Sequence, residues 1–175
     1  LNCDSEEEGE LFVGCAGGAD LDVSMQFKED TYIPEGDVAV KISLTGLKGG
    51  HSGVDIHLGR ANANKLMFRF LKEAVRDYGA RLSSIDGGSL RNAIPREAFA
   101  VLTIPGDNVE ALWELVSDYQ EMYRTEYKGI ECNINFTAGM TDMPATLIPE
   151  EIQDDLINAI EGCQNGVISM LVDFP

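Results

Sequence analysis

Hydrophobic residues occupy every second position from Val38 to Leu44, within the segment 37–46. This period of two predicts a strand with one buried face. Residues 61–78 instead carry apolar side chains three and four positions apart, and Gly79 follows them. That spacing predicts an amphipathic helix that ends at the glycine.

A second set of elements follows this helix. Residues 80–86 and 97–104 are predicted strands, separated by a connection that begins with paired glycines. Apolar side chains from Val109 to Tyr123 then recur at helical spacing, and Asp107 is the predicted N-cap of this second helix.

Apolar residues alternate with polar ones, Glu131 among them, over residues 130–136, which predicts a fourth strand. The resulting order, β-α-β-β-α-β, is that of a ferredoxin-like sheet with two helices on one face. We therefore predict an α+β fold. Outside this unit the pattern predicts extra strands and a C-terminal helix, with strands at residues 11–15, 21–28 and 166–172 and the helix near residues 149–161.

The composition is that of one globular domain with a strongly acidic surface. The chain has 175 residues, 44% of them hydrophobic, and a net charge of −17. Nucleic acids and anionic membranes carry the same sign of charge, so neither is an expected partner. The sequence contains no membrane-spanning apolar run and no visible signal peptide, and its four cysteines are widely spaced. These features predict a cytoplasmic protein with reduced thiols.

Both ends of the chain are unusual for a complete protein. The chain begins at Leu1 without a methionine and stops at Pro175, shortly after an apolar run. We therefore expect a fragment of a longer protein, and we expect part of its functional site to lie outside the chain.

An acidic run near the start is the first candidate for chemistry. Residues 4–10 (DSEEEGE) contain five carboxylates. Carboxylate oxygens bind divalent cations, but such a run is also typical of a solvated acidic turn. The spacing alone does not decide between these interpretations, because no histidine lies near it in the sequence.

A histidine between glycines is the second candidate. His51 lies in the sequence GGHSG at residues 49–53, between the first strand and the first helix. Glycines offer no side chains to bury an imidazole, so this one is either presented to a ligand or is an ordinary polar loop residue. The spacing of His57 from His51 fits neither one helical face nor one strand face, so the pair does not predict a metal site. The adjacent Ser52 does not complete a catalytic triad.

The third candidate lies in the connection between the two middle strands, at residues 87–95. Asn92 and Pro95 are typical of a turn, which accounts for the segment without any ligand. The alternative is that the Asn92 amide contacts a substrate carbonyl or carboxylate. The glycines do not form a phosphate-binding motif.

Taken together, these segments resemble a known family. The runs DSEEEGE and GCAGG (within residues 4–18), GLKGGHSG and GRANANK (within 46–65) and RNAIPREAFA (91–100) resemble the bacterial Xaa-His dipeptidases. These aminoacyl-histidine dipeptidases belong to the zinc aminoacylase, carboxypeptidase and dipeptidase superfamily. The likeness extends from Leu1 to about Tyr119, and the long motifs in the same order make it specific.

The resemblance implies a two-zinc catalytic domain that is interrupted by a lid or dimerisation domain. Residues 1–18 are then the tail end of the catalytic domain, and residues 19–175 are a lid truncated at its C-terminus. Asp4 matches a metal-ligand aspartate, His51 a lid histidine that contacts the substrate carbonyl and the developing oxyanion, and Asn92 a substrate-binding lid asparagine. The other metal ligands, the catalytic glutamate and a lid arginine are expected outside the chain.

We therefore expect the lid fragment of a cytoplasmic zinc dipeptidase that cleaves carnosine-like Xaa-His dipeptides and forms a homodimer. Alone, the fragment is expected to be inactive and to bind zinc weakly, because Asp4 cannot supply the three or four ligands that zinc needs. The alternative is a stand-alone ferredoxin-like module that dimerises, or that holds a small effector between residues 46–53 and 88–95. Neither the preferred dipeptide nor the native metal follows from the sequence.

Overall fold

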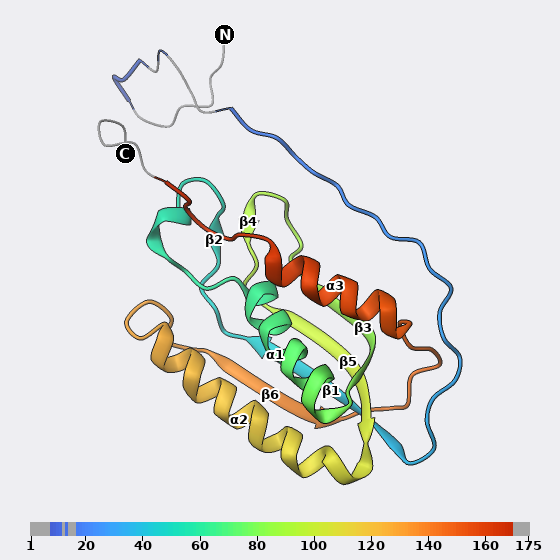
Figure 1. The fold of residues 1–175 in the computed structure, drawn as a ribbon. Helices are drawn as coiled ribbons and strands as arrows, with labels where there is room; N and C mark the ends of the chain where they lie inside the picture. Colours follow the sequence, from blue (N-terminus) through green and yellow to red (C-terminus); the bar gives the residue numbers. More distant parts are fainter. Residues whose placement is uncertain (1–7, 12, 14–16, 170–175) are drawn as a thin grey trace.

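The computed structural model describes residues 8–11, 13 and 17–169. They form a main sheet covered by helices, with a small two-stranded ribbon beyond one end of the sheet (Figure 1). The elements are, in chain order, β1 (Asp37–Thr45), β2 (Gly50–His51), the 3₁₀ helix η1 (Ile56–Leu58), α1 (Ala63–Tyr78), β3 (Arg81–Gly87), β4 (Ala93–Ile94), β5 (Ala98–Pro105), the 3₁₀ helix η2 (Gly106–Asn108), α2 (Val109–Glu126), β6 (Asn135–Met140) and α3 (Glu150–Gly162).

The main sheet has the strand order β3-β5-β1-β6, and all neighbouring strands in it are antiparallel. Helix α1 joins β1 to β3 across β5, and helix α2 joins β5 to β6 across β1. Each crossover therefore leaves room for one strand between the two that it connects, which is the split βαβ arrangement. The predicted α+β fold with its ferredoxin-like order is confirmed.

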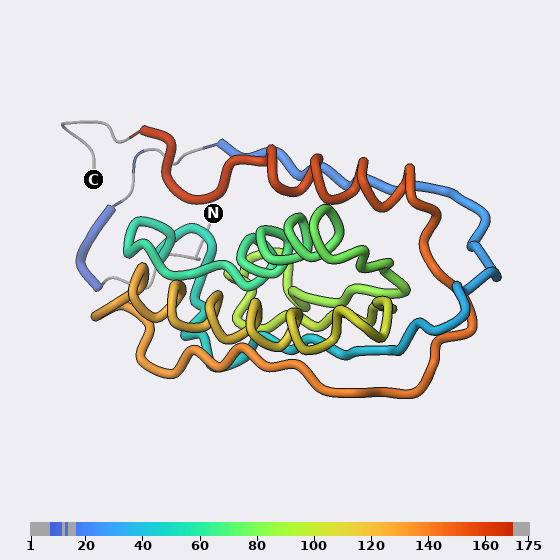
Figure 2. The backbone as a smooth tube through the Cα atoms, turned by 60° about the horizontal axis from the view of Figure 1, so that its bottom comes forward, coloured from blue at the N-terminus to red at the C-terminus, as the bar shows by residue number. Residues whose placement is uncertain are grey.

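Three helices form a layer on one face of the sheet. Figure 1 and Figure 2 show α2, α1 and α3 side by side, with α1 in the middle. Val40, Ile42 and Leu44 of β1 are fully buried in the core, whereas Lys41 is exposed on the opposite face. No helix in the described part of the chain is long and apolar enough to cross a membrane.

An aromatic cluster joins the sheet to α1 and α2. The Phe70 ring centroid lies 4.9 Å from that of Phe136 in β6 and 5.4 Å from that of Tyr119 in α2, both edge to face. Tyr123 is fully buried, and its hydroxyl donates to the Leu66 carbonyl (2.6 Å). Burial raises the pKa of the Tyr123 phenol, so this group stays protonated and continues to donate.

Both ends of α1 are fixed by local hydrogen bonding. Asn62 Oδ1 accepts from the backbone N–H groups of Asn64 (3.0 Å) and Lys65 (3.3 Å), which is N-capping. Gly79 has φ +72°, a left-handed conformation that suits glycine at the C-terminal end. The predicted helix is confirmed, with its first residue at Ala63.

The strand predicted at residues 130–136 is wrong in its boundaries. β6 begins at Asn135 and continues to Met140. Before it, the chain turns after α2, and the N–H of Glu131 donates to the Tyr127 carbonyl (2.9 Å). Glu131 lies before β6 and is buried: the residue is 4% exposed, and its carboxylate accepts backbone hydrogen bonds.

The prediction that Asp107 caps the second helix is also wrong. Asp107 lies within η2, and α2 begins after this 3₁₀ turn, at Val109. Asn108 occupies the cap position without capping the helix through its side chain. Its Nδ2 instead donates to the Tyr78 carbonyl (3.0 Å), which links the start of α2 to the end of α1.

The strand predicted at residues 21–28 is not formed. This segment is extended but pairs with no strand among the described residues, and Leu21 and Val23 are 88% and 76% exposed. Just after this segment, Asp30 forms a bridge with Leu147. Alternation alone cannot make a strand where no neighbouring strand supplies the hydrogen bonds.

The two terminal strand predictions fall partly outside the described residues. Within residues 11–15 the structure describes Leu11 and Val13, and neither is in a strand. Within residues 166–172 it describes 166–169, again without a strand. The predicted C-terminal helix is confirmed as α3.

Removing the central ring of the aromatic cluster should destabilise the fold strongly. Phe70→Ala is expected to lower the free energy of unfolding by about 3–5 kcal/mol, because the side chain is fully buried and its loss leaves a cavity. Urea denaturation measures this change. Phe27→Ala is the matched control, since Phe27 is 41% exposed, and it should cost less than about 0.5 kcal/mol. Equal losses in the two variants would contradict this account of the core.

Candidate functional site

The two glycine-rich connections are held together by the short ribbon of β2 and β4. These strands pair antiparallel, with His51 opposite Ala93. The backbone N–H of Ser52 extends the pairing by donating to the Asn92 carbonyl (2.9 Å). The structure therefore brings His51 and Asn92 to the same ribbon, although they lie far apart in the sequence (Figure 1).

The imidazole of His51 is exposed, and the backbone fixes its tautomer. Nδ1 accepts from the N–H groups of Gly53 (3.0 Å) and Val54 (3.1 Å). A ring nitrogen that accepts carries no proton, so the proton of the neutral ring is on Nε2. Nε2 has no hydrogen-bond partner within the described residues and is a donor available to a ligand.

A charged pair inside the same loop supports the backbone of His51. Asp55 Oδ2 accepts from the His51 N–H (2.9 Å) and pairs with Arg60 Nη1 (3.2 Å). Arg60 Nη1 also donates to the Gly49 carbonyl (2.7 Å). The side chains of Asp55 and Arg60 are only 28% and 24% exposed, so water screens this pair less than it screens a fully exposed one.

Gly50 has a packing role in this loop. Its φ is +145°, and a Cβ atom there would overlap with Arg60 Nη1 and with Asp55 Oδ2. Any other residue would therefore displace the charged pair that supports His51. The glycine before the histidine allows a close approach, which is a different role from chain flexibility.

The second connection is anchored to the start of α1. Asn64 Nδ2 donates to the Gly87 carbonyl (3.3 Å), and the Ala63 N–H donates to the Pro95 carbonyl (2.9 Å). These contacts hold the beginning and the end of the connection that carries Asn92. The first turn of α1 therefore fixes where this side of the ribbon lies.

The end of α3 is fixed at the same place by Lys65. The Lys65 Nζ donates to the carbonyls of Ile160 (2.7 Å), Glu161 (2.8 Å) and Cys163 (2.8 Å). A cation at a helix C-terminus satisfies carbonyls that the last turn leaves unpaired. The segment after α3 then runs past the ribbon (Figure 1).

A cavity of about 580 Å³ lies between the two connections. Glycines of both connections line it, together with apolar side chains that include Leu90 and Phe99. The charged residues that line it are Lys48, Asp86, Arg96 and Glu97. The cavity thus presents both signs of charge, and neither His51 nor Asn92 lines it.

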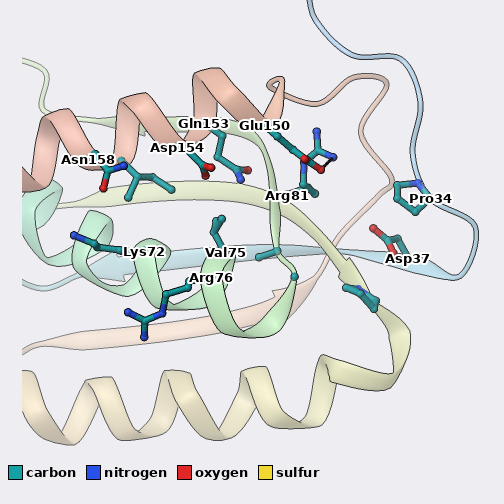
Figure 3. A pocket seen from close by; sticks show the side chains of 14 residues that line it. Pro34, Asp37, Lys72, Val75, Arg76, Arg81, Glu150, Gln153, Asp154 and Asn158 are labelled. Carbon is teal, nitrogen blue, oxygen red and sulfur yellow. Dashed lines mark hydrogen bonds and ion pairs between the residues drawn. The ribbon is translucent and has the colours of Figure 1, made fainter.

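A second hollow, of about 600 Å³, lies between α1 and α3 near the C-terminal end of α1 (Figure 3). At its border, Arg81 pairs with Glu150 (2.7 Å) and Asp30 (3.6 Å). Gln153 Oε1 accepts from the Leu82 N–H (2.6 Å). These polar groups hold α3 against β3, and the hollow lies away from the ribbon, which adjoins the N-terminal end of α1.

The metal interpretation falls largely outside the described residues, because Asp4 is not among them. Within residues 8–11, 13 and 17–169, no group of three or more His, Cys, Asp or Glu side chains could hold a metal ion. These residues therefore do not fit a zinc site by themselves.

The hydrophobic pattern of the sequence does not reveal the residues that support the ribbon. Asp55 and Arg60 lie outside any hydrophobic period, and Asn64 is a polar position within the predicted helix. A two-residue strand such as β2 or β4 is too short to show a period. The signal that was available is Asn62, a favourable N-cap residue directly before the first helical stripe. It marks a helix start at which several polar side chains are free to bond to neighbouring loops.

The tautomer of His51 can be measured directly, because the chain has only two histidines. In alkaline solution, where the neutral ring is observed, the ¹⁵N shifts of His51 should report an unprotonated Nδ1 and a protonated Nε2. His57, which has no such hydrogen bonds in the described structure, is the internal control and should average between tautomers. The same average for both rings would contradict the geometry of the loop.

Comparison with known proteins agrees with this fold. Residues 42–131 match the peptidase dimerisation domain family (M20 dimer). Over 168 residues the chain is 41% identical to the cytosol non-specific dipeptidase of Escherichia coli (strain K12), a match that covers 96% of this chain and 34% of that protein. The crystal structure of aminoacylhistidine dipeptidase from Vibrio alginolyticus superimposes with a TM-score of 0.80 and 42% identity, over 83% of this chain and 30% of that one.

The chain spans about a third of the length of these relatives. The family match lies inside the ferredoxin-like unit, from β1 to the turn that follows α2, and includes both connections of the ribbon. The chain therefore belongs to the peptidase dimerisation domain family.

Proposed function

We propose that this chain is the lid and dimerisation segment of a metal-dependent dipeptidase. In this proposal residues 1–18 belong to the catalytic domain and residues 19–175 to the lid. The observation that carries it is the β2–β4 ribbon, which joins His51 and Asn92 on one exposed edge of the molecule. The dipeptidase names of both relatives support the reaction class.

His51 serves in this proposal as a hydrogen-bond donor to the substrate carbonyl. Its exposed Nε2–H is already in the donating tautomer, because Nδ1 is engaged by Gly53 and Val54. Negative charge develops on the carbonyl oxygen as the carbon becomes tetrahedral, so the hydrogen bond strengthens towards the transition state. A donor fixed in advance needs no reorganisation at that moment.

Asn92 serves as the second substrate contact. Its side chain is exposed, and its amide offers both donors and an acceptor. A terminal carboxylate or a peptide carbonyl of a dipeptide is therefore a suitable ligand. The Asn92 carbonyl accepts a hydrogen bond from the Ser52 N–H, so we expect the two loops to move together.

Asp4 is the one residue of the chain that we propose as a zinc ligand. The remaining ligands and the catalytic base are assigned to segments outside this chain, because zinc needs more ligands than Asp4 supplies. The part of hydrolysis that we give to the described residues is binding, orientation and the exclusion of water as the lid closes.

The substrate class that we propose is the dipeptides, with Xaa-His dipeptides as its first members to test. One relative is named for aminoacyl-histidine and the other is named non-specific, so both a histidine dipeptide and an unrelated dipeptide belong in the assay. A cytoplasmic location is proposed with it, from the cytosolic name of the Escherichia coli relative.

The cavity between the two connections favours a second candidate function, the binding of a small effector. Its lining includes both Lys48 and Glu97, which would suit a ligand that carries both charges, such as an amino acid. Calorimetry of the isolated chain with free amino acids separates the candidates. If an amino acid binds and Lys48→Ala abolishes this binding, the result would support an effector site. If no amino acid binds, the lid function remains as the single candidate.

Removing the His51 imidazole tests the proposed function. In the complete enzyme, His51→Ala should lower kcat on the order of 100-fold, the usual effect of losing one oxyanion donor. KM should change less than kcat, because the bond strengthens in the transition state. The free energy of unfolding should change by less than about 1 kcal/mol, since the side chain is exposed.

His57→Ala is the matched control for that experiment, because His57 is an exposed histidine in the same loop. It should leave kcat unchanged. A His51→Ala enzyme with near-normal turnover would remove His51 from the mechanism. A variant that fails to fold would make the residue structural.

We also propose that the chain forms a homodimer through the edge of β6. β6 is an outer strand of the main sheet, and Met140 at its end is 60% exposed, with Met143 beyond it 48% exposed. An edge strand has unpaired backbone groups that can bond to a second copy across a two-fold axis. The exposed methionines add apolar surface at the same edge.

Light scattering at high micromolar concentration tests this interface. The unmodified chain should have a mass well above the 19.1 kDa of one copy. Met140→Glu should shift the protein towards the monomer, because it places a charge on the proposed edge. Ser84→Glu, on the opposite edge strand β3, is the control and should not. A strict monomer for the unmodified chain would contradict the proposal.

A further inference from the structure

The base of the loop that carries His51 is closed by one buried carboxylate. Glu131 Oε2 accepts from the backbone N–H of Lys48 (2.8 Å), and Glu131 Oε1 accepts from the backbone N–H of Ala61 (3.1 Å). Lys48 and Ala61 are the two ends of the segment that contains β2, η1 and His51. A single side chain, distant in sequence from both, therefore joins the ends of this loop.

The hydrogen bonds of Glu131 are difficult to replace by water. The residue is 4% exposed, and no Lys or Arg side chain in the described part of the chain lies within ion-pair distance of it. A buried carboxylate that loses a hydrogen bond is left with an unsatisfied charge, which is strongly unfavourable. The position of Glu131 therefore fixes the positions of the backbone N–H groups at both ends of the loop.

Glu131 itself is held by the turn after α2. Its N–H donates to the Tyr127 carbonyl (2.9 Å), and the neighbouring Asn133 backbone lies directly against Gly46. Gly46 has φ +82°, and a Cβ there would overlap with the Asn133 carbonyl. The carboxylate thus reaches the loop from a segment that is packed against the end of β1.

These contacts divide the support of the loop into two parts. The Asp55–Arg60 pair lies inside the loop and stabilises its conformation. Glu131 lies at the base of the loop and fixes its position relative to the sheet. His51 hydrogen-bonds to Asp55 through its backbone but makes no hydrogen bond to Glu131. A change at Glu131 would therefore reach the imidazole only through the backbone.

We propose that Glu131 is a positioning residue, which places the His51 loop relative to the sheet without touching the substrate. The relevance of this placement to catalysis rests on the proposed function of His51. The placement itself can be measured without any activity, because the loop amides report it.

Glu131→Gln is the direct test, since it keeps the side-chain shape but replaces one acceptor oxygen by an amide donor. In the same side-chain position, the amide oxygen faces one of the two N–H groups and the NH₂ group faces the other, which then has no acceptor. Native-state hydrogen exchange should be about 10-fold or more faster at Lys48, Ala61 and Ser52, whose N–H groups bond to Glu131 or to the other connection. The amides of β1 and β5 should keep their rates. Glu114→Gln removes the same charge from an exposed position on α2 and is the matched control.

Either of two results would overturn the inference. In the first, the loop amides of Glu131→Gln keep the rates of the unmodified chain. In the second, all amides accelerate together or the variant does not fold, which would make Glu131 a general stability element. A second measurement, on the unmodified chain, does not depend on whether the variant folds. In the unmodified chain, hydrogen exchange at the amides of Lys48 and Ala61 should be slowed at least about 100-fold, and unprotected amides would also overturn the inference.

The complete enzyme separates this inference from the proposed function. Glu131→Gln should lower kcat about 10-fold with a smaller change in KM, because a donor displaced by a fraction of an ångström stabilises the transition state less well. Faster loop exchange with unchanged kcat would support the positioning of the loop and contradict the role of His51. Unchanged loop exchange would overturn the inference whatever the activity.

Discussion

The backbone groups of two glycine-rich connections need hydrogen-bond partners, and the arrangement of the site depends on how these groups are bonded. Within the first connection, His51 and Asp55 accept from N–H groups and Arg60 donates to Gly49. Side chains outside the connections supply further partners, because Glu131 accepts from the base of the first connection and Asn64 donates to Gly87 of the second. Buried backbone groups need such partners. Once they are bonded in this way, β2 and β4 lie in register.

The ferredoxin-like sheet explains why these partners are available at one place. The split βαβ order brings the end of β1, the start of α1 and the β3–β5 connection to the same end of the sheet (Figure 1). Lys65 adds the end of α3. The sheet and its helices thus hold an exposed ribbon at one end, which is consistent with the proposed lid, in which His51 and Asn92 contact the substrate.

Hydrophobic periodicity predicted the elements that bury one apolar face. It did not predict the parts of the chain whose structure depends on hydrogen bonds between distant segments. The stripe of α1 and the alternation of β1 were read correctly, because each element packs one apolar face on the core. Glu131 was assigned to the fourth strand, which begins only at Asn135, since nothing local reveals its hydrogen bonds to Lys48 and Ala61. For the same reason His51 and Asn92 were recognised one by one, but the pairing that joins them was not predicted.

The central claim is that His51 and Asn92 act on one bound dipeptide from one ribbon. A double-mutant cycle in the complete enzyme, with kcat/KM measured for His51→Ala, Asn92→Ala and the double variant, tests it most directly. The account predicts that each single change lowers kcat/KM and that the double change lowers it by less than the product, with a coupling free energy of about 1 kcal/mol or more. Effects that simply multiply, or single changes without effect, would contradict it.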